Sequence, residues 1–297
     1  MVCFEPVNCD YVANFELLKI NLRGVPLKVP AERKNFEFDM DEFKAAFSSK
    51  TRLLILENPN RYTGKVFSNE ELESIFGFLD KEHTSVRVIT SEVYNLPLLN
   101  SPSFNVVSPV KNNLNKTISL YSAGEVYNCS GWKIGWAIGS AELIKRAAVI
   151  SSAIYYSISQ PSQVAFGRAL EQLDSKENDQ EGMIWLEALK KDLCLQRETL
   201  VKEVTKAGLV PVHNHAGFNL VVDVSGIKEK VPQKYTESNE YESVVRKEDN
   251  SIPLDVAVSK YLQEEKKILL TPLSICYSKK NKQLAENLVA SSYASDC

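Results

Sequence analysis

Three loops of this chain carry side chains that can take part in ligand binding or acid–base chemistry. They contain Arg61, the pair Ser91 and Tyr94, and Glu125. Each loop follows a short apolar run, which is typical of a buried parallel strand that ends at the carboxyl edge of a sheet. Open α/β sheets bind ligands at that edge. The carboxylate of Glu125 can accept a proton as a base, but it has no amine nitrogen and cannot form an imine with an aldehyde.

The cysteines and histidines do not predict a metal site. The six cysteines are scattered without Cys-x-x-Cys spacing, so we expect free thiols in a reducing compartment. His213 and His215 can be read as a ligand pair, but the segment around Asn214 is more typical of an ordinary surface turn. We therefore expect no metal ion.

Strands that alternate with helices must position the three loops. The apolar run 53–56 predicts a buried strand, and Ser68 and Glu71 have the spacing of a capping box that begins a helix. The apolar face of that helix consists of Leu72, Ile75, Phe76 and Leu79. Further strands are expected over 86–90, 117–121 and 134–138. This order predicts an α/β fold with a largely parallel sheet.

The second part of the chain begins with a long helical pattern over 183–207, which ends at Gly208. A helix of this length can connect two domains. We expect a large domain over 1–182, followed by a connecting helix and a smaller α+β domain over 183–297. The polar segment 226–251 has almost no apolar periodicity, which predicts a long surface loop or partial disorder.

Composition excludes several classes of protein. The chain is 44% hydrophobic and 25% charged, which is ordinary for a globular protein. A net charge of −3 with dispersed basic residues argues against nucleic acid or an anionic membrane surface as a partner. No apolar run approaches the ~20 residues that span a bilayer, and the first residues do not form a signal peptide. We expect a cytoplasmic protein.

The segment 122–136, SAGEVYNCSGWKIGW, resembles the cofactor segment of fold-type I pyridoxal-phosphate aminotransferases. The resemblance is strongest to the kynurenine/glutamine aminotransferase (cysteine-S-conjugate β-lyase) branch, and other matching segments follow in the same order. These are 4–11, 24–27, 57–67, 89–94 and 271–278. The resemblance implies a large domain with a mostly parallel sheet flanked by helices, a smaller C-terminal α+β domain, pyridoxal phosphate as cofactor, and a dimer. It also implies that both ends of the family's chain are missing here, including its glycine-rich phosphate loop.

Four positions nearest the reacting atoms depart from the family pattern. Glu125 stands where the family has the lysine that forms the Schiff base, and Ser91 where an aspartate keeps the pyridine nitrogen protonated. Arg61 stands where an asparagine holds the 3′-hydroxyl. Ala290 stands where an arginine clamps the α-carboxylate of the substrate, so this clamp is lost.

Three positions keep the family's residue type. The resemblance assigns Tyr94 to the 3′-hydroxyl, and Ser122 and Lys133 to the phosphate. No neighbouring residue in the sequence compensates the charge that Glu125 brings close to the phosphate, and we expect Arg61 to face solvent. The resemblance therefore implies that transamination and covalent attachment of the cofactor are lost.

Three interpretations stay open at this point. The chain can be a truncated gene product that folds poorly. It can be a pseudoenzyme that forms a homodimer, or a heterodimer with an active paralogue that it regulates. It can also keep residual transaminase or lyase chemistry on pyridoxal or pyridoxamine phosphate held without a covalent bond, with Glu125 as base and an amino acid or 2-oxo acid as ligand.

Overall fold

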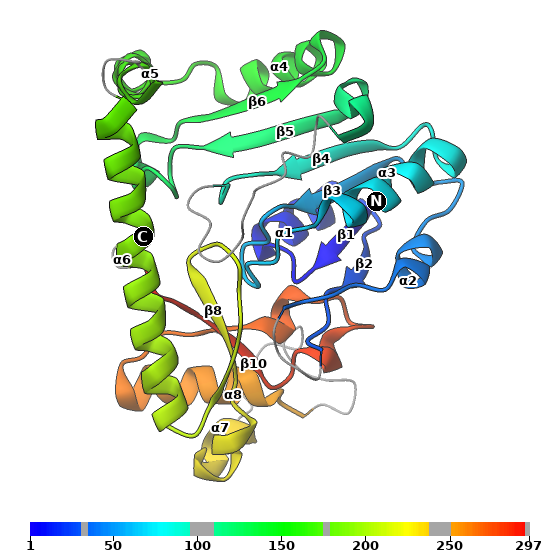
Figure 1. Ribbon diagram of the computed structural model, residues 1–297. Helices are drawn as coiled ribbons and strands as arrows, with labels where there is room; N and C mark the ends of the chain where they lie inside the picture. The colour runs from blue at the N-terminus through cyan, green and yellow to red at the C-terminus, as the bar shows by residue number, and fades with distance from the viewer. Residues whose placement is uncertain (31–34, 96–109, 175–178, 238–250, 295–297) are drawn as a thin grey trace.

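Two sheets organise the residues that the computed structural model describes, which are 1–30, 35–95, 110–174, 179–237 and 251–294. A six-stranded sheet contains the N-terminal strands, and a four-stranded sheet contains the C-terminal ones. The long helix α6 (Asp179–Lys206) runs beside both sheets (Figure 1). It covers the predicted helical pattern and spans the expected domain boundary at residue 182, which stays a prediction.

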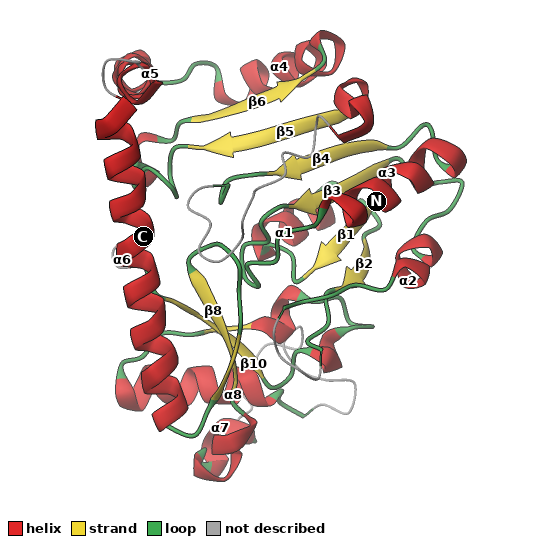
Figure 2. Cartoon of the chain, viewed as in Figure 1, coloured by secondary structure: helices red, strands yellow, loops and turns green. Residues whose placement is uncertain are grey.

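The first sheet has the strand order β2-β1-β3-β4-β5-β6. Its strands are β1 (Val2–Glu5), β2 (Arg23–Pro26), β3 (Leu53–Glu57), β4 (Arg87–Ser91), β5 (Thr117–Ser122) and β6 (Gly135–Gly139). All neighbouring strands are parallel except β5 and β6, which are antiparallel. The predicted strands and the predicted α/β class are confirmed (Figure 2).

Helices cover both faces of this sheet because side chains alternate along a strand. Leu54 and Leu56 pack in the main core cluster with residues of α3, whereas Ile55 packs on the opposite face with residues of α1. The helices of this part are α1 (Cys9–Leu17), α2 (Met40–Ala45), α3 (Asn69–Glu82), α4 (Ala141–Tyr155) and α5 (Gln160–Asp174). Short 3₁₀ turns are η1 (Val110–Asn115) and η2 (Ser130–Trp132).

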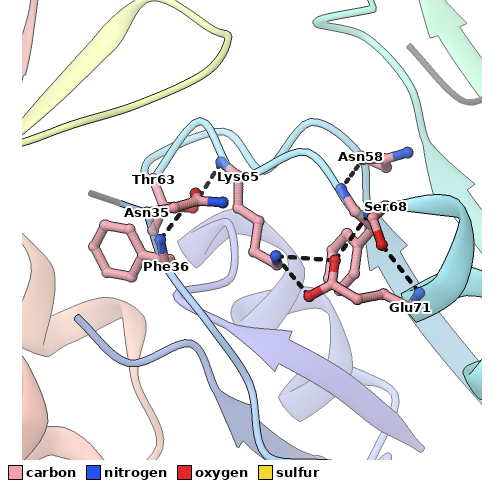
Figure 3. Close-up of polar contacts among 8 residues, drawn as sticks. Asn35, Phe36, Asn58, Thr63, Lys65, Ser68 and Glu71 are labelled. Carbon is pink, nitrogen blue, oxygen red and sulfur yellow. Dashed lines mark hydrogen bonds and ion pairs between the residues drawn. The ribbon is translucent and has the colours of Figure 1, made fainter. Parts of the chain in front are cut away.

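The capping box that begins α3 is confirmed (Figure 3). The backbone nitrogen of Glu71 donates to Ser68 Oγ at 3.2 Å, and the backbone nitrogen of Ser68 donates to the Glu71 carboxylate at 2.8 Å. All four predicted apolar residues of the helix are buried. The main core beneath them is rich in aromatic rings, with Phe4 stacked on Phe43 at a centroid distance of 5.5 Å.

The second sheet is antiparallel, with the order β7-β8-β10-β9. Its strands are β7 (Val210–Val212), β8 (Asn219–Asp223), β9 (Thr271–Pro272) and β10 (Leu288–Ser292). Helix α8 (Leu254–Tyr261) continues as a wider turn, η4 (Leu262–Lys266), and two 3₁₀ turns follow, η5 (Leu273–Cys276) and η6 (Lys282–Leu284). Side chains of α6 and α8 pack in one core cluster with this sheet.

The prediction of an irregular loop over 226–251 is wrong for its first part. Residues 225–236 form the 3₁₀ turn η3 (Ser225–Lys230) and the short helix α7 (Gln233–Thr236). Ile227, Val231 and Tyr235 are buried in the second core cluster. They recur every four residues, which is a helical spacing that the surrounding charged residues conceal. Residues 238–250 lie outside the described residues.

Asp255 on α8 makes the stability of the fold depend on pH. Its Oδ2 accepts a hydrogen bond from the Ser274 backbone nitrogen at 2.7 Å, while its buried Oδ1 has no partner. Burial raises the pKa of Asp255 from 3.8 to about 7, against the opposing effect of the hydrogen bonds from Ser274. An acid with a raised pKa binds its proton more tightly in the folded than in the unfolded state. The free energy of unfolding therefore falls as the pH rises from about 4 to about 7, and this contribution is constant at higher pH.

The variant Asp255→Asn is expected to lose this part of the pH dependence, because its amide oxygen still accepts from Ser274 but does not titrate. One pKa unit corresponds to about 1.4 kcal/mol, so the full change is about 4 kcal/mol. Urea unfolding of both proteins at about pH 5 and about pH 8 samples about two of these pKa units, so the free energy of unfolding of wild type is expected to fall by about 3 kcal/mol more than that of Asp255→Asn. An equal change in the free energy of unfolding of the two proteins between these pH values would show that the pKa of Asp255 is not raised by folding.

Within the described residues, no helix combines the length and the apolar character that crossing a membrane requires. The cysteines whose side chains the structure describes are free thiols, as the sequence predicts. They are Cys3, Cys129, Cys194 and Cys276.

Candidate functional site

The register of the parallel strands brings the three predicted loops to one edge of the first sheet. Glu57, the last residue of β3, lies opposite Ser91, the last residue of β4. The backbone nitrogen of Asn58 donates to the Ser91 carbonyl at 2.9 Å, and that of Glu92 donates to the Leu120 carbonyl of β5 at 2.9 Å. The side chains that follow these strands therefore share the carboxyl edge, where parallel sheets bind ligands.

A network of buried side chains holds the loop that carries Arg61. Asn60 is 1% exposed, and its amide nitrogen donates to the Pro6 carbonyl at 2.9 Å. Its oxygen accepts from the Thr63 backbone nitrogen at 3.0 Å and from the Thr63 hydroxyl at 2.9 Å. Gly64 has φ +61°, and a Cβ there would lie 2.2 Å from the Ala216 carbonyl oxygen. The loop is therefore fixed against both the first strand and the segment before β8.

Lys65 at the end of this loop is committed to an ion pair (Figure 3). Its side chain is 3% exposed, and its ammonium lies 2.9 Å and 3.0 Å from the two carboxylate oxygens of Glu71. An ammonium that donates to both oxygens of a carboxylate is held in place by that pair. Lys65 is therefore engaged with Glu71 and not with the residues around Glu125.

Arg61 is only partly exposed and interacts electrostatically with Glu125, whereas the sequence predicts an Arg61 that faces solvent. The Arg61 side chain is half-buried, and its neighbours act on its charge. Burial lowers the pKa of the guanidinium, but these neighbours together raise it above its ordinary value. They are Tyr94, Tyr62, Glu125 and Glu57. The residue of opposite charge that interacts with Glu125 is therefore distant in the sequence.

Glu125 itself is half-buried, and its Oε2 is a buried atom without a hydrogen-bond partner. Glu125 follows Ser122, Ala123 and Gly124 beyond the end of β5, and the turn is held because the Gly124 backbone nitrogen donates to Ser122 Oγ at 2.9 Å. A buried carboxylate oxygen with no partner carries a desolvation cost that a donor from a ligand would remove.

Ser91 lies in a buried polar group with Tyr11 and Glu57, which the sequence did not predict to lie together. Its hydroxyl hydrogen-bonds to the hydroxyl of Tyr11 on α1. Burial raises the pKa of Tyr11, and the charge of Glu57 adds to this effect, whereas Ser91 and Arg61 lower it. Glu57 is 7% exposed, and its carboxylate accepts from the Arg61 backbone nitrogen at 3.2 Å. Burial also raises the pKa of Glu57.

Tyr11 and Glu57 are thus site residues that the sequence analysis missed as such. One signal for Glu57 was available, because a carboxylate at the last position of a fully apolar strand is unusual. Tyr11 lies on a helix far from the other residues along the chain, and only the packing of α1 on the sheet brings it to Ser91.

A cavity of about 860 Å³ opens beside Glu125. Its walls include Ser122, Gly124, Glu125, Ser130, Lys133 and Tyr155. Its size suits a small organic ligand. Ser122 is half-buried and Lys133 is exposed, and both residues line the same cavity as Glu125.

The remaining predicted residues lie outside this cavity. Tyr94 is 4% exposed and packs edge-on against Phe218 at a centroid distance of 5.4 Å, and it lies close to Arg61. Ala290 is on β10, opposite Val221 of β8, and is 3% exposed in the main core. A methyl group in an apolar core offers nothing that binds a carboxylate.

Comparisons with known proteins identify similar chains. The family described as "Aminotransferase class I and II" matches residues 3–289. Kynurenine–oxoglutarate transaminase from Dictyostelium discoideum is 29% identical over 269 residues, which are 89% of this chain and 57% of that protein. Kynurenine–oxoglutarate transaminase 3 from Mus musculus is 28% identical over 298 residues, which are 97% of this chain and 59% of that protein. This chain thus spans about three fifths of the length of these relatives.

Solved structures agree with this result. Bna3p from Saccharomyces cerevisiae superimposes with a TM-score of 0.84 at 26% identity, covering 98% of this chain and 66% of that one. N-Succinyldiaminopimelate aminotransferase from Mycobacterium tuberculosis superimposes with a TM-score of 0.81 at 25% identity, covering 98% of this chain and 66% of that one.

Proposed function

Because the chain belongs to the class I and II aminotransferase family, whose members depend on pyridoxal phosphate, we propose that it is a non-catalytic relative of the kynurenine–oxoglutarate transaminases. In this proposal it has lost covalent attachment of the cofactor and transamination. It keeps a pocket that holds a phosphorylated pyridoxal compound without a covalent bond.

One observation carries the proposal. The residue at the position of the family's lysine is Glu125, and its buried Oε2 lacks a partner at the wall of a cavity. A carboxylate provides no nitrogen to attack an aldehyde. Lys65 is paired with Glu71, and Lys133 is an exposed residue eight positions after Glu125 that we assign to the phosphate. Neither lysine takes over the missing position.

The cavity residues fit the phosphate of such a compound. Ser122 Oγ and the Lys133 ammonium line one cavity and supply a hydroxyl donor and a positive charge. When bound, the pyridine ring supplies an electron sink, which needs a carboxylate at its nitrogen to work well. Ser91 offers only a neutral hydroxyl, already hydrogen-bonded to Tyr11. In this proposal two groups for the phosphate are kept, whereas the groups that drive the reaction are replaced.

The test is to incubate the purified protein with pyridoxal phosphate, reduce it with borohydride and map labelled peptides by mass spectrometry. We expect no stoichiometric label on any single residue, with only scattered label on exposed lysines. We also expect no amino-group transfer from kynurenine or glutamine to 2-oxo acids. One stoichiometric label, for example on Lys133, or measurable amino-group transfer would overturn the proposal.

A further inference from the structure

We propose that the pocket selects the amine form of the cofactor, pyridoxamine 5′-phosphate, over the aldehyde and alcohol forms, because Glu125 presents a carboxylate where the family has an amine. This inference rests on the proposed function, since it concerns the same pocket. It concerns which compound is bound, whereas the proposed function concerns the loss of a covalent bond.

Glu125 changes the charge that this position presents to a ligand. A lysine at this position is an ammonium or an imine nitrogen facing the ligand, whereas Glu125 presents an anion. The structure leaves Oε2 of this anion buried and without a hydrogen-bond donor. A ligand that brings a charged donor to Oε2 therefore removes an existing cost and gains a charge-assisted hydrogen bond.

The three candidate ligands differ in their hydrogen-bonding groups and in charge. The three phosphorylated forms share the ring, the 3′-oxygen and the phosphate, and differ only in the group on one carbon. The amine form carries an ammonium with three donors, the alcohol form a neutral hydroxyl, and the aldehyde form a carbonyl that only accepts. Only the ammonium complements the Glu125 carboxylate in charge and in hydrogen bonding.

The residues around Glu125 do not distinguish the three compounds. The charge of Glu125 contributes to the raised pKa of the Arg61 guanidinium, so the two groups interact electrostatically. Arg61 faces all three compounds with the same charge and does not discriminate among them. Ser122 and Lys133 line the same cavity, and we assign them to the phosphate that the three forms share. Selectivity for the group on the ring carbon is therefore assigned to Glu125.

The experiment is calorimetric titration of the full chain with pyridoxamine 5′-phosphate and with pyridoxine 5′-phosphate, the neutral alcohol form, which cannot react with lysines. We expect wild type to bind the amine form about tenfold more tightly than the alcohol form, a difference of about 1.4 kcal/mol. In Glu125→Gln this ratio is expected to fall to about twofold or less, with the affinity for the alcohol form unchanged.

Two matched variants complete the design. Lys133→Met is expected to weaken both compounds by the same factor and to leave their ratio unchanged, because it removes only a phosphate contact. Glu229→Gln removes an exposed carboxylate in η3 and is expected to change neither affinity. Thermal melting of each variant shows whether it is folded.

Equal affinity of wild type for the two compounds, or a ratio that survives in Glu125→Gln, would overturn the inference. Failure of both compounds to bind would overturn the inference and also the retained pocket of the proposed function, while the loss of covalent attachment would still stand. Conversely, a stoichiometric borohydride label in wild type would refute the proposed function without altering the measured ratio. The two failures are therefore distinguishable.

Discussion

Glu125→Lys is expected to bind pyridoxal phosphate covalently, which wild type is not expected to do. The variant places an amine at the position of the family's lysine, next to a cavity with a phosphate-binding hydroxyl at Ser122. Arg61 is close in space, and its guanidinium would lower the pKa of the new ammonium. A larger fraction of the lysine would therefore be the neutral nucleophile near neutral pH. After borohydride reduction we expect one covalently bound cofactor per chain in Glu125→Lys and no stoichiometric label in wild type.

The measurement is the intact mass after borohydride reduction, with the labelled peptide identified by fragmentation. Glu125→Gln is the matched control, because it removes the charge but adds no nucleophilic amine. Transamination is not expected to return in Glu125→Lys, since Ser91 and Ala290 still replace the aspartate and the arginine. A variant that binds pyridoxine 5′-phosphate but acquires no label would contradict the assignment of Glu125 to the lysine position.

Gly24→Ala is expected to destabilise the fold by at least about 3 kcal/mol. A Cβ at Gly24 would lie 1.9 Å from the carboxylate carbon of Glu5, so this side chain must move. Glu5 is 1% exposed and accepts hydrogen bonds from the Ser278 backbone nitrogen at 2.7 Å and from Asn281 Nδ2 at 2.7 Å. Displacing the carboxylate leaves a buried charged group without its donors. The contact also joins the first sheet to the segment that follows η5.

Urea unfolding of wild type and variant measures this loss as a lower transition midpoint. Gly167→Ala is the matched control, because a Cβ there meets no atom within 4 Å. Gly167 lies inside helix α5, so alanine is expected to be neutral or to stabilise by up to about 1 kcal/mol. Equal midpoints for Gly24→Ala and wild type would show that the Glu5 contact contributes nothing to stability.

Local sequence patterns predicted much of the fold. The apolar run 53–56 predicted β3, and the spacing of Ser68 and Glu71 predicted the start of α3. These signals are reliable because a strand or a cap depends on residues close together in the chain. The loop prediction over 226–251 was wrong for η3 and α7. Their buried residues are only one in four, and their burial depends on the second core cluster.

The sequence by itself determined the family and the residue types at the positions that we assign to its key groups, because residue identity decides whether a nitrogen nucleophile or a guanidinium exists. Glu125 is a carboxylate and Ala290 is a methyl group in any fold. Only the tertiary structure decided how these changes are accommodated. It placed Arg61 beside Glu125 and Glu57 opposite Ser91. These pairs depend on the register of parallel strands that are distant in the chain, and no local pattern encodes a register between distant strands.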